Sequence, residues 1–277
     1  MTHSIIRLEL EDIPSVLPSL VSDVLQFKDL LWHIQEGLPV TMWADDASIP
    51  RNILVVAPSD DEQENTSYAD LYAPDPVWIE SAMQRALECT CVTEWMVHGD
   101  EAPDPVWFHP DLFWRTELDL QWHSRPQRVL QNDRVFMRHL SADDHQEVCE
   151  FLFVCPDIPD HLRQDTLVAL RQEKTLVWGL WHQRSLAAFL TAKAFVFDLW
   201  DVEFIYTAER FRGSGFASLL ATNYGSEISS AGMRPLYCSP LSQASQRAAE
   251  NAGFRVYKRR LHGMTRDNWH RLPYFAD

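Results

Sequence analysis

The chain has 277 residues, of which 46% are hydrophobic and 12% aromatic, and its formal net charge is −16. This composition supports one large or two ordinary globular domains and excludes an intrinsically disordered chain. The charge is uneven: residues 1–130 carry 23 acidic and 7 basic side chains, whereas residues 131–277 carry 17 of each. General nucleic-acid binding needs clustered positive charge, so this balance argues against it.

The sequence patterns that mark membrane spans, secretion and zinc binding are not found in this chain. No apolar run approaches the roughly 20 residues that span a bilayer, and the polar start MTHSIIRLELED is unlike a secretion signal. Five cysteines are an odd number, and neither Cys89-x-Cys91 nor the pair Cys149 and Cys155 has zinc-ligand spacing. We therefore expect reduced thiols, no bound metal and a cytoplasmic protein.

The first half is predicted to form a mixed α/β unit. Helical spacing runs from residue 12 to Gly37, and a second helix starts at Asp75-Pro76. The hexapeptide APDPVW occurs at 73–78 and again at 102–107, and it predicts an Asp-capped turn that begins with proline. An acidic loop is expected at 58–67. The expected strands are 40–43, 53–56, 68–72, 92–97 and 113–122.

A polar stretch at 124–133 that contains Pro126 predicts a linker between two domains, residues 1–130 and 131–277. After it, the expected order is strand, two helices, three strands, a glycine turn, helix, strand, helix and strand. The expected strands are 135–140, 176–181, 186–195, 201–207, 236–238 and 255–261. The expected helices are 141–154, 160–174, 216–230, with Gly232 at its end, and 239–251.

The stretch from Asp201 to Leu220 reads as a strand, a tight turn and a helix start. Arg210-Phe211-Arg212-Gly213-Ser214-Gly215 interrupts the strand, and a helix begins at Phe216. The first amides of a helix have no internal partner, and the helix dipole makes that end mildly positive. With two arginines beside it, this glycine turn predicts an anion site suited to phosphate.

Three kinds of phosphate-binding site contain such a turn, and the residues of this chain match them to different degrees. A P-loop requires Lys and then Ser or Thr after the second glycine, but Phe216-Ala217 follow here. A dinucleotide fingerprint tolerates Ser218 as its third small residue, but the next strand candidate ends in Ser239-Pro240 instead of an acid. The third kind of site binds the pyrophosphate of coenzyme A. The pattern Arg210-x-x-Gly213-x-Gly215 resembles the acyl-CoA loop of the GNAT superfamily of N-acetyltransferases.

A second motif extends this resemblance to about 135 residues, from Arg134 to Arg266. Residues 242–254, SQASQRAAENAGF, are similar to the helix motif N-x-x-S-x-x-x-Y-x-x-x-G-F of the same superfamily, and residues 179–189 look like its hairpin. The resemblance implies an α/β (α+β) fold with a mixed, mostly antiparallel sheet flanked by helices. The chain also resembles the two-lobed glycine N-acyltransferase-like subgroup, in which a degenerate lobe precedes an active one. By this resemblance residues 1–130 would be the degenerate lobe, and they contain no R-x-x-G-x-G motif.

The resemblance implies a site for acetyl-CoA as the acyl donor. Backbone amides of the glycine turn would wrap the pyrophosphate, and the end of the preceding strand would pair with the pantetheine arm. A backbone amide near Tyr206 would hold the thioester oxygen. The implied binding residues are Ile205, Tyr206, Thr207, Arg210, Phe211, Arg212, Gly213, Ser214, Gly215, Phe216, Ala217, Ser242 and Ser245.

The second motif departs from the family at two positions that matter for chemistry. Ser242 stands for the asparagine, and Ala249 stands for the tyrosine that often protonates the leaving thiolate. A thiolate with a pKa near 8.5 can leave without full protonation. The alternatives for a general acid are Tyr237 and Tyr257, and Cys238-Ser239 could also lie beside the thioester.

Amine acylation also needs a base, because an ammonium group is not a nucleophile. Glu203 is the first candidate, followed by Asp201 on the same strand and Asp198 just before it. The expected function is transfer of an acetyl or other short acyl group from acyl-CoA to an amine of a small molecule, without membrane or nucleic-acid partners, and a homodimer is the one oligomer considered. The rivals are a non-catalytic CoA-binding module and a nicotinamide-dependent enzyme.

Overall fold

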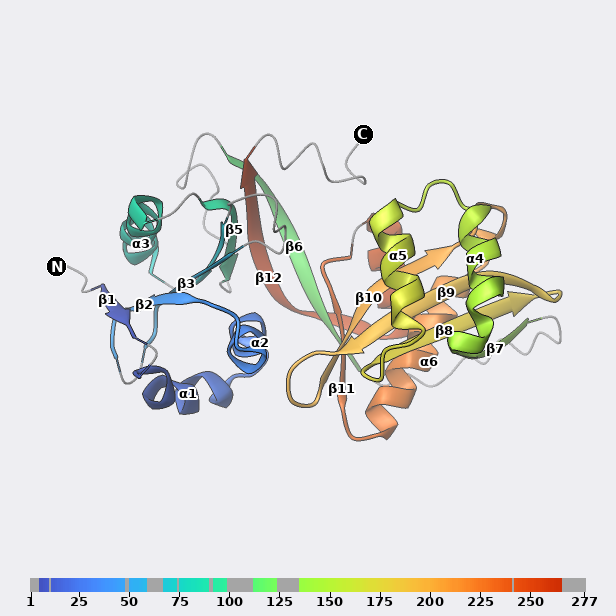
Figure 1. Cartoon of the computed structure of the whole chain (residues 1–277), viewed down its shortest axis with the longest axis horizontal. Coiled ribbons are helices and arrows are strands. Elements are labelled where there is room, and N and C mark those ends of the chain that lie inside the picture. The colour runs from blue at the N-terminus through green and yellow to red at the C-terminus, as the bar shows by residue number, and fades with distance from the viewer. Residues whose placement is uncertain are drawn as a thin grey trace. The chain divides into compact units, whose positions relative to one another are not determined.

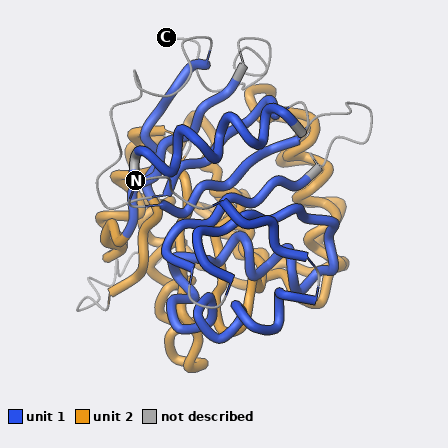
Figure 2. The backbone as a smooth tube through the Cα atoms, turned by 90° about the vertical axis from the view of Figure 1, so that its left-hand side faces the viewer, with its two compact units in different colours: residues 1–118, 258–277 blue, residues 119–257 orange. Residues whose placement is uncertain are grey.

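The computed structural model describes residues 5–9, 11–47, 50–58, 67–73, 75–89, 92–98, 112–123, 135–240 and 242–265. The chain divides into two compact units (Figures 1 and 2). Unit 1 holds residues 1–118 and 258–277, and unit 2 holds residues 119–257. The strands β6 (Leu112–Trp122) and β12 (Phe254–Thr265) each run from one unit into the other.

Unit 1 begins with a short strand and two helices, followed by a sheet. The single helix expected at 12–37 is two helices, because the Asp23 carboxylate accepts the Gln26 amide at 3.1 Å, a local bond that competes with helix continuation. Gly37 ends the second helix in the left-handed conformation, as expected. The elements are β1 (Ile6–Leu8), α1 (Ile13–Ser22), α2 (Lys28–Glu36), β2 (Thr41–Ala44), β3 (Ile53–Pro58), β4 (Ser67–Tyr72), α3 (Pro76–Cys89) and β5 (Val92–His98).

The strands β2, β3, β4, β5 and β6 confirm the five strands expected in the first half, with small shifts of their ends, and β1 is an additional strand. The unit 1 strands are hydrogen-bonded in the order β1-β2-β3-β4-β5-β12, antiparallel except for the parallel pair β4 and β5. Asp75 caps α3 by accepting the Val77 amide at 2.9 Å. This confirms the turn expected from the first APDPVW copy; the second copy lies outside the described residues. Trp78 on α3 and Trp95 on β5 are fully buried in the core between this helix and the sheet.

The second face of the unit 1 sheet carries a charged cluster, most of whose members are buried. Its described members come from α2, β4, β5, β6 and β12: Lys28, Asp29, Asp70, Glu94, His98, Arg115, Glu117, Lys258, Arg260 and His262. Asp70 Oδ1 lies 2.9 Å from His98 Nε2, and both side chains are buried. Burial, followed by the charge of Asp29, raises the pKa of Asp70 to about 7.

We expect Asp70→Asn to stabilise the chain at pH 8 by at least about 1 kcal/mol, because one pKa unit corresponds to about 1.4 kcal/mol. Since the folded pKa of Asp70 is above its unfolded value, this group lowers stability as the pH rises from about 4 to about 7. Asparagine keeps an acceptor for His98 without the charge. Urea unfolding at pH 8 and pH 5 measures the effect, and a gain from Asp70→Asn of equal size at both values would contradict it.

Unit 2 repeats the element order of unit 1, namely strand, two helices, three strands, helix and strand. The elements are β7 (Val135–Leu140), α4 (His145–Phe153), α5 (Asp160–Ala169), β8 (Thr175–His182), β9 (Ser185–Ala194), β10 (Leu199–Thr207), α6 (Phe216–Ser230), β11 (Arg234–Cys238) and α7 (Gln243–Ala252). The 3-10 turn η2 (Ala142–Asp144) precedes α4, and Ser141 caps it as expected. The linker expected at 124–133 lies outside the described residues.

The unit 2 elements confirm the order expected from the sequence and correct two helix bounds. α5 ends at Ala169 instead of 174, because the Thr175 hydroxyl donates to the Ala169 carbonyl at 2.6 Å. α7 begins at Gln243 instead of 239, because Ser242 caps it by accepting the Ser245 amide at 3.1 Å. α6 has the expected bounds, and Gly232 follows its end with φ +79°.

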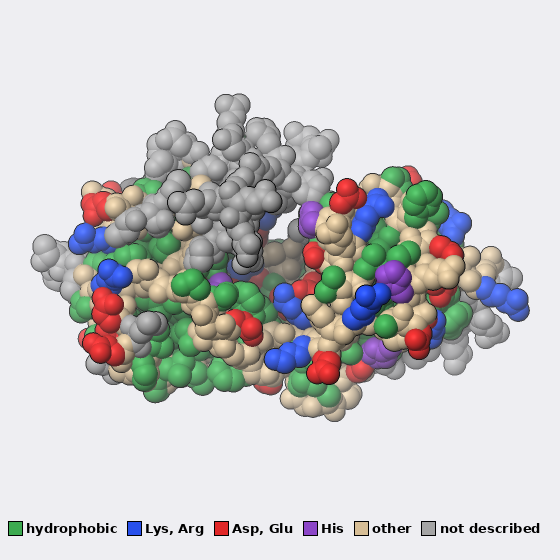
Figure 3. Space-filling view, viewed as in Figure 1, with side chains coloured by type: hydrophobic (Ala, Val, Ile, Leu, Met, Phe, Trp, Pro, Cys, Tyr) green, Lys and Arg blue, Asp and Glu red, His purple; other side chains and the backbone are tan. Residues whose placement is uncertain are grey.

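The unit 2 sheet is mostly antiparallel, and helices cover both of its faces. The strands are ordered β7-β8-β9-β10-β11-β6, and only β10 and β11 are parallel among these described strands. α4 and α5 cover one face, and α6 covers the other (Figure 1). This confirms the mixed α/β fold class expected from the sequence. Acidic and basic side chains are interspersed over the α4 and α5 face (Figure 3).

Candidate functional site

The central parallel pair of unit 2 opens into a fork. β10 pairs with β11 only from Leu199 to Asp201, although β10 continues to Thr207 and β11 to Cys238. The Asp201 carboxylate accepts the Cys238 amide at 3.0 Å, so it bridges the two strands where the fork begins. Beyond it, one edge of β10 is left without a neighbouring strand among the described residues, whereas the other edge pairs with β9. A free strand edge can pair with an extended ligand.

Unit 1 has no such fork between the corresponding described strands. β4 and β5 stay paired from Ser67 with Val92 to Tyr72 with His98. The edge that is free in β10 is therefore occupied in β4. In the described part of the chain, the opening between parallel strands is found in unit 2 alone.

The glycine turn lies at the open end of the fork. A 3-10 turn, η3 (Glu209–Phe211), follows β10, and Gly213 and Gly215 then take left-handed φ values of +79° and +81°. Gly215 caps α6 without any side-chain hydrogen bond. The amides of Gly215, Phe216 and Ala217 have no acceptor among the described residues. The turn thus presents free amides at a helix start, the arrangement that binds phosphate.

The two arginines of the turn have different surroundings. Arg212 pairs with Asp157, and it donates to the Tyr206 hydroxyl and to the Thr207 carbonyl, each at 3.3 Å. The Tyr206 hydroxyl also donates to Asp157. Burial of Asp157 opposes ionisation, but the hydrogen bonds from Tyr206 and Arg212 outweigh it and lower the pKa of Asp157. Arg210 has no carboxylate within 4.0 Å among the described residues and packs on the Phe211 ring.

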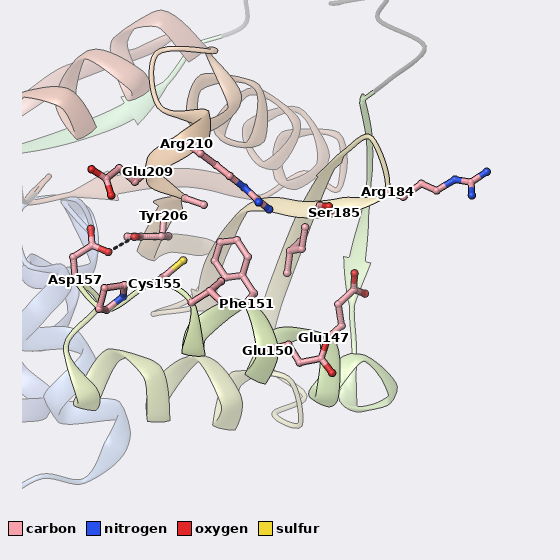
Figure 4. Close-up of a pocket in the computed structure, with 14 residues that line it drawn as sticks. Glu147, Glu150, Phe151, Cys155, Asp157, Arg184, Ser185, Tyr206, Glu209 and Arg210 are labelled. Atoms are coloured by element: carbon pink, nitrogen blue, oxygen red, sulfur yellow. Dashed lines mark hydrogen bonds between the residues drawn. The ribbon is translucent and has the colours of Figure 1, made fainter.

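A pocket of about 510 Å³ lies in unit 2 between the end of α4 and the end of β10 (Figure 4). Its floor is apolar and includes Phe151, Leu186 and Tyr206, all buried. Phe151 and Arg210 point toward the hollow, whereas Arg184 and Glu209 point away from it. The other lining residues are Glu147, Glu150, Val154, Cys155, Pro156, Asp157, Ser185 and Ala208.

The three candidate bases have different partners. Glu203 lies at a bulge in β10, between Val202 and Phe204, and pairs with Lys193 Nζ at 2.6 Å. Asp201 is the residue that bridges the fork. Asp198 accepts two hydrogen bonds from the Arg234 guanidinium, at 2.8 and 2.5 Å, and this pairing lowers its pKa.

The candidate general acid Tyr237 is buried between β11 and α7. Its hydroxyl lies 2.5 Å from Ser245 Oγ, and burial raises the pKa of the phenol. The structure therefore brings Tyr237 together with Ser245, whereas the Ser242 hydroxyl serves as the helix cap. Ala249, at the position of the family tyrosine, is fully buried.

Sequence reasoning missed Asp157, Lys193 and the pocket floor around Phe151. Asp157 follows Pro156 in the break between two helices, where no periodic pattern marks it. Lys193 stands opposite Asp201 on the neighbouring strand, a register that only strand pairing reveals. The alternation of β10 does show that Phe204 and Tyr206 share the buried face.

Among the described residues, no helix is long and apolar enough to cross a membrane. In the same part of the chain, no three His, Cys, Asp or Glu side chains are grouped as metal ligands. Cys149, Cys155 and Cys238 are not joined in disulfides.

Comparison with solved structures identifies the fold. A GNAT-family acetyltransferase from Colwellia psychrerythraea is similar over 95% of this chain and 100% of its own, with a TM-score of 0.58 and 16% identity. A GCN5-related N-acetyltransferase from Sphaerobacter thermophilus is similar over 94% and 95%, with a TM-score of 0.59 and 11% identity.

A GCN5-related N-acetyltransferase from Kribbella flavida covers 77% of this chain and 86% of its own, with a TM-score of 0.53 and 13% identity. No family model and no curated protein matches the sequence. At these identities the likeness shows the fold, which is that of the GNAT acetyltransferases, as the two sequence motifs predicted.

Proposed function

We propose that this chain, which has the GNAT fold, transfers an acetyl or other short acyl group from acyl-CoA to an amine of a small molecule. The observation that carries the proposal is the fork between β10 and β11, with the glycine turn at its open end. The free edge of β10 suits the amide-bearing pantetheine arm, and the free amides of the turn suit the pyrophosphate. The buried Thr207 hydroxyl, which has no partner among the described residues, fits a ligand along this edge.

Each part of the site has a role in this proposal. Gly213, Gly215, Phe216 and Ala217 bind the pyrophosphate through backbone amides, and the edge of β10 from Ile205 to Thr207 holds the pantetheine. Acyl-CoA supplies an activated thioester, and a β10 amide near Tyr206 stabilises the charge that develops on its oxygen. Glu203 accepts the proton of the amine, directly or through a water molecule.

Tyr237 is the proposed acid for the leaving thiolate. The phenol is protonated at neutral pH, but burial raises its pKa and makes it a weaker acid than an exposed tyrosine, so its contribution to thiolate departure is modest. We expect Tyr237→Phe to lower kcat roughly tenfold at pH 7.5, because a thiolate with a pKa near 8.5 leaves partly unaided.

Thiol release under acetyl-CoA saturation measures this effect. Full activity of the Tyr237→Phe protein would remove Tyr237 from the mechanism.

The proposal is tested by release of free CoA thiol over a panel of small primary amines. Turnover on at least one amine, with an acylated product seen by mass spectrometry, supports it. The rival function is a CoA-binding module without catalysis, and Ala249 in place of the family tyrosine favours it. CoA binding without turnover on any amine would support that rival.

We further propose that unit 1 is a second GNAT-like lobe that has lost the acyl-CoA site. Its element order repeats that of unit 2 from β1 to β5, and the similarity to the Colwellia structure covers 95% of this chain. Its β4 and β5 remain paired where β10 and β11 part. The first lobe would then contribute structure or acceptor contacts instead of acyl-CoA binding.

A further inference from the structure

Asp157 is a carboxylate that the proposed chemistry does not use. It lines the pocket between α4 and β10, where the hydroxyl of Tyr206 donates to it. Its cationic partner is Arg212, which belongs to the glycine turn. Asp157 therefore connects the phosphate-binding turn to the pocket through a single guanidinium.

Arg212 can exchange this partner at little cost. The Arg212 and Asp157 side chains are 51% and 48% exposed, and half-exposed ion pairs contribute little to stability. Phosphate groups match a guanidinium with two parallel hydrogen bonds and more charge than one carboxylate. An acyl-CoA pyrophosphate on the glycine turn would thus compete with Asp157 for Arg212.

The pocket suits an amine with an apolar body. Its floor of Phe151, Leu186 and Tyr206 is buried and apolar, and its volume is in the range of small-molecule sites. Arg184 and Glu209 both point away from the hollow (Figure 4), and the remaining charged residues that line it are three carboxylates, Glu147, Glu150 and Asp157, and one arginine, Arg210. This excess of negative charge favours a cationic ligand.

We propose that this pocket binds the acceptor as an arylalkyl or alkyl ammonium ion, with Asp157 as its ion-pair partner once acyl-CoA phosphates have drawn Arg212 away. The inference rests on the proposed function and concerns binding before the amine loses its proton. Tyr206 then holds Asp157 in place, since its hydroxyl bond to that carboxylate does not involve Arg212.

The consequence is positive coupling between the two ligands. With Arg212 on Asp157, an incoming ammonium ion must displace it; with Arg212 on phosphate, the carboxylate is available. Couplings of this kind change affinity by roughly 5- to 150-fold, and each ligand must raise the affinity of the other by the same factor.

The test is calorimetric titration of 2-phenylethylamine into the full chain, with and without saturating CoA. Free CoA carries the phosphates but no acyl group, so no turnover occurs. We expect the amine to bind at least about fivefold more tightly with CoA present, and 2-phenylethanol, which lacks the charge, to show no such gain.

Three variants assign the effect to residues. Asp157→Asn keeps an acceptor for Tyr206 but removes the charge, so it should lose amine binding and keep CoA binding. Glu209→Gln, which removes a carboxylate that points away from the hollow, is the matched control and should behave as the wild type. Arg212→Met frees Asp157, so amine affinity should be high without CoA and independent of it.

Equal amine affinity with and without CoA in the wild type would overturn the inference, as would an Asp157→Asn protein that binds the amine as well as the Glu209→Gln control does. Failure of the proposed function looks different: CoA itself would not bind the wild type. Titrations of Arg212→Met and Asp157→Asn without CoA would still show whether Asp157 binds an ammonium ion.

Discussion

Replacing Glu203 by Gln should lower kcat for amine acylation by roughly 10²- to 10⁴-fold, the range for loss of a general base. Glu203 lies at the β10 bulge, just past the point where β11 separates, and it is partly exposed to solvent. Glutamine preserves its shape and cannot accept the proton. The affinity for acetyl-CoA should be unchanged, because the proposed CoA contacts lie farther along β10 and in the turn.

Two controls define the role of Glu203 as a base. Lys193→Met removes its partner at 2.6 Å and tests whether the ion pair, instead of the carboxylate, supports activity. In the Glu203→Gln protein, kcat should rise with pH as the amine itself deprotonates. Activity within threefold of the wild type would exclude Glu203 and transfer the role to Asp201 or Asp198.

Replacing Glu117 by Gln should destabilise unit 1 by about 3–5 kcal/mol, the usual cost of breaking a buried ion pair from one side. Glu117 is buried beside three potential cations: Arg115, Arg260 at 3.3 Å, and His262 Nδ1 at 2.7 Å. Glutamine leaves their charge uncompensated. The midpoint of urea unfolding should fall with no change in the slope of the transition.

The matched control is Glu88→Gln, which breaks an exposed pair with Arg85 at 3.1 Å and should change stability by less than about 1 kcal/mol. Burial opposes ionisation of Glu117, but the hydrogen bond from His262 and the charges of Arg260 and Arg115 outweigh it and lower its pKa.

Because the folded pKa is depressed, Glu117 stabilises the fold above its unfolded pKa near 4.5 and loses this effect as the pH falls below that value. The difference in stability between the wild type and Glu117→Gln should therefore shrink in acid. A difference that stays constant from pH 7 to pH 3 would contradict this account.

The second half could be predicted well from the sequence because its signals are local. Alternation marked β10, two glycines marked the turn, and Phe216 to Gly232 carried a complete helix with its stop. The proposed phosphate-binding role of the turn rests on the same residues, since it depends on backbone conformation and a helix start. These are short-range features that a single sequence displays.

The features that could not be predicted depend on contacts distant in sequence. The charged cluster of unit 1 brings Asp29 to Arg260, which follows it by 231 residues. Asp157 pairs with Arg212, which lies 55 residues away in the sequence. The pairing of β6 with β11 and of β12 with β5 is likewise set by the tertiary fold, since nothing in either strand specifies its neighbour.

The most direct test of the central claim is calorimetric titration of acetyl-CoA into the full chain and into an Arg212→Glu, Gly213→Trp variant. Gly213 has φ +79°, so tryptophan strains the turn, and glutamate opposes phosphate charge. The proposal predicts binding to the wild type and a loss of at least about 100-fold in the variant, with circular dichroism showing that the variant remains folded. No binding to the wild type, or equal binding to both proteins, would contradict an acyl-CoA site at the glycine turn.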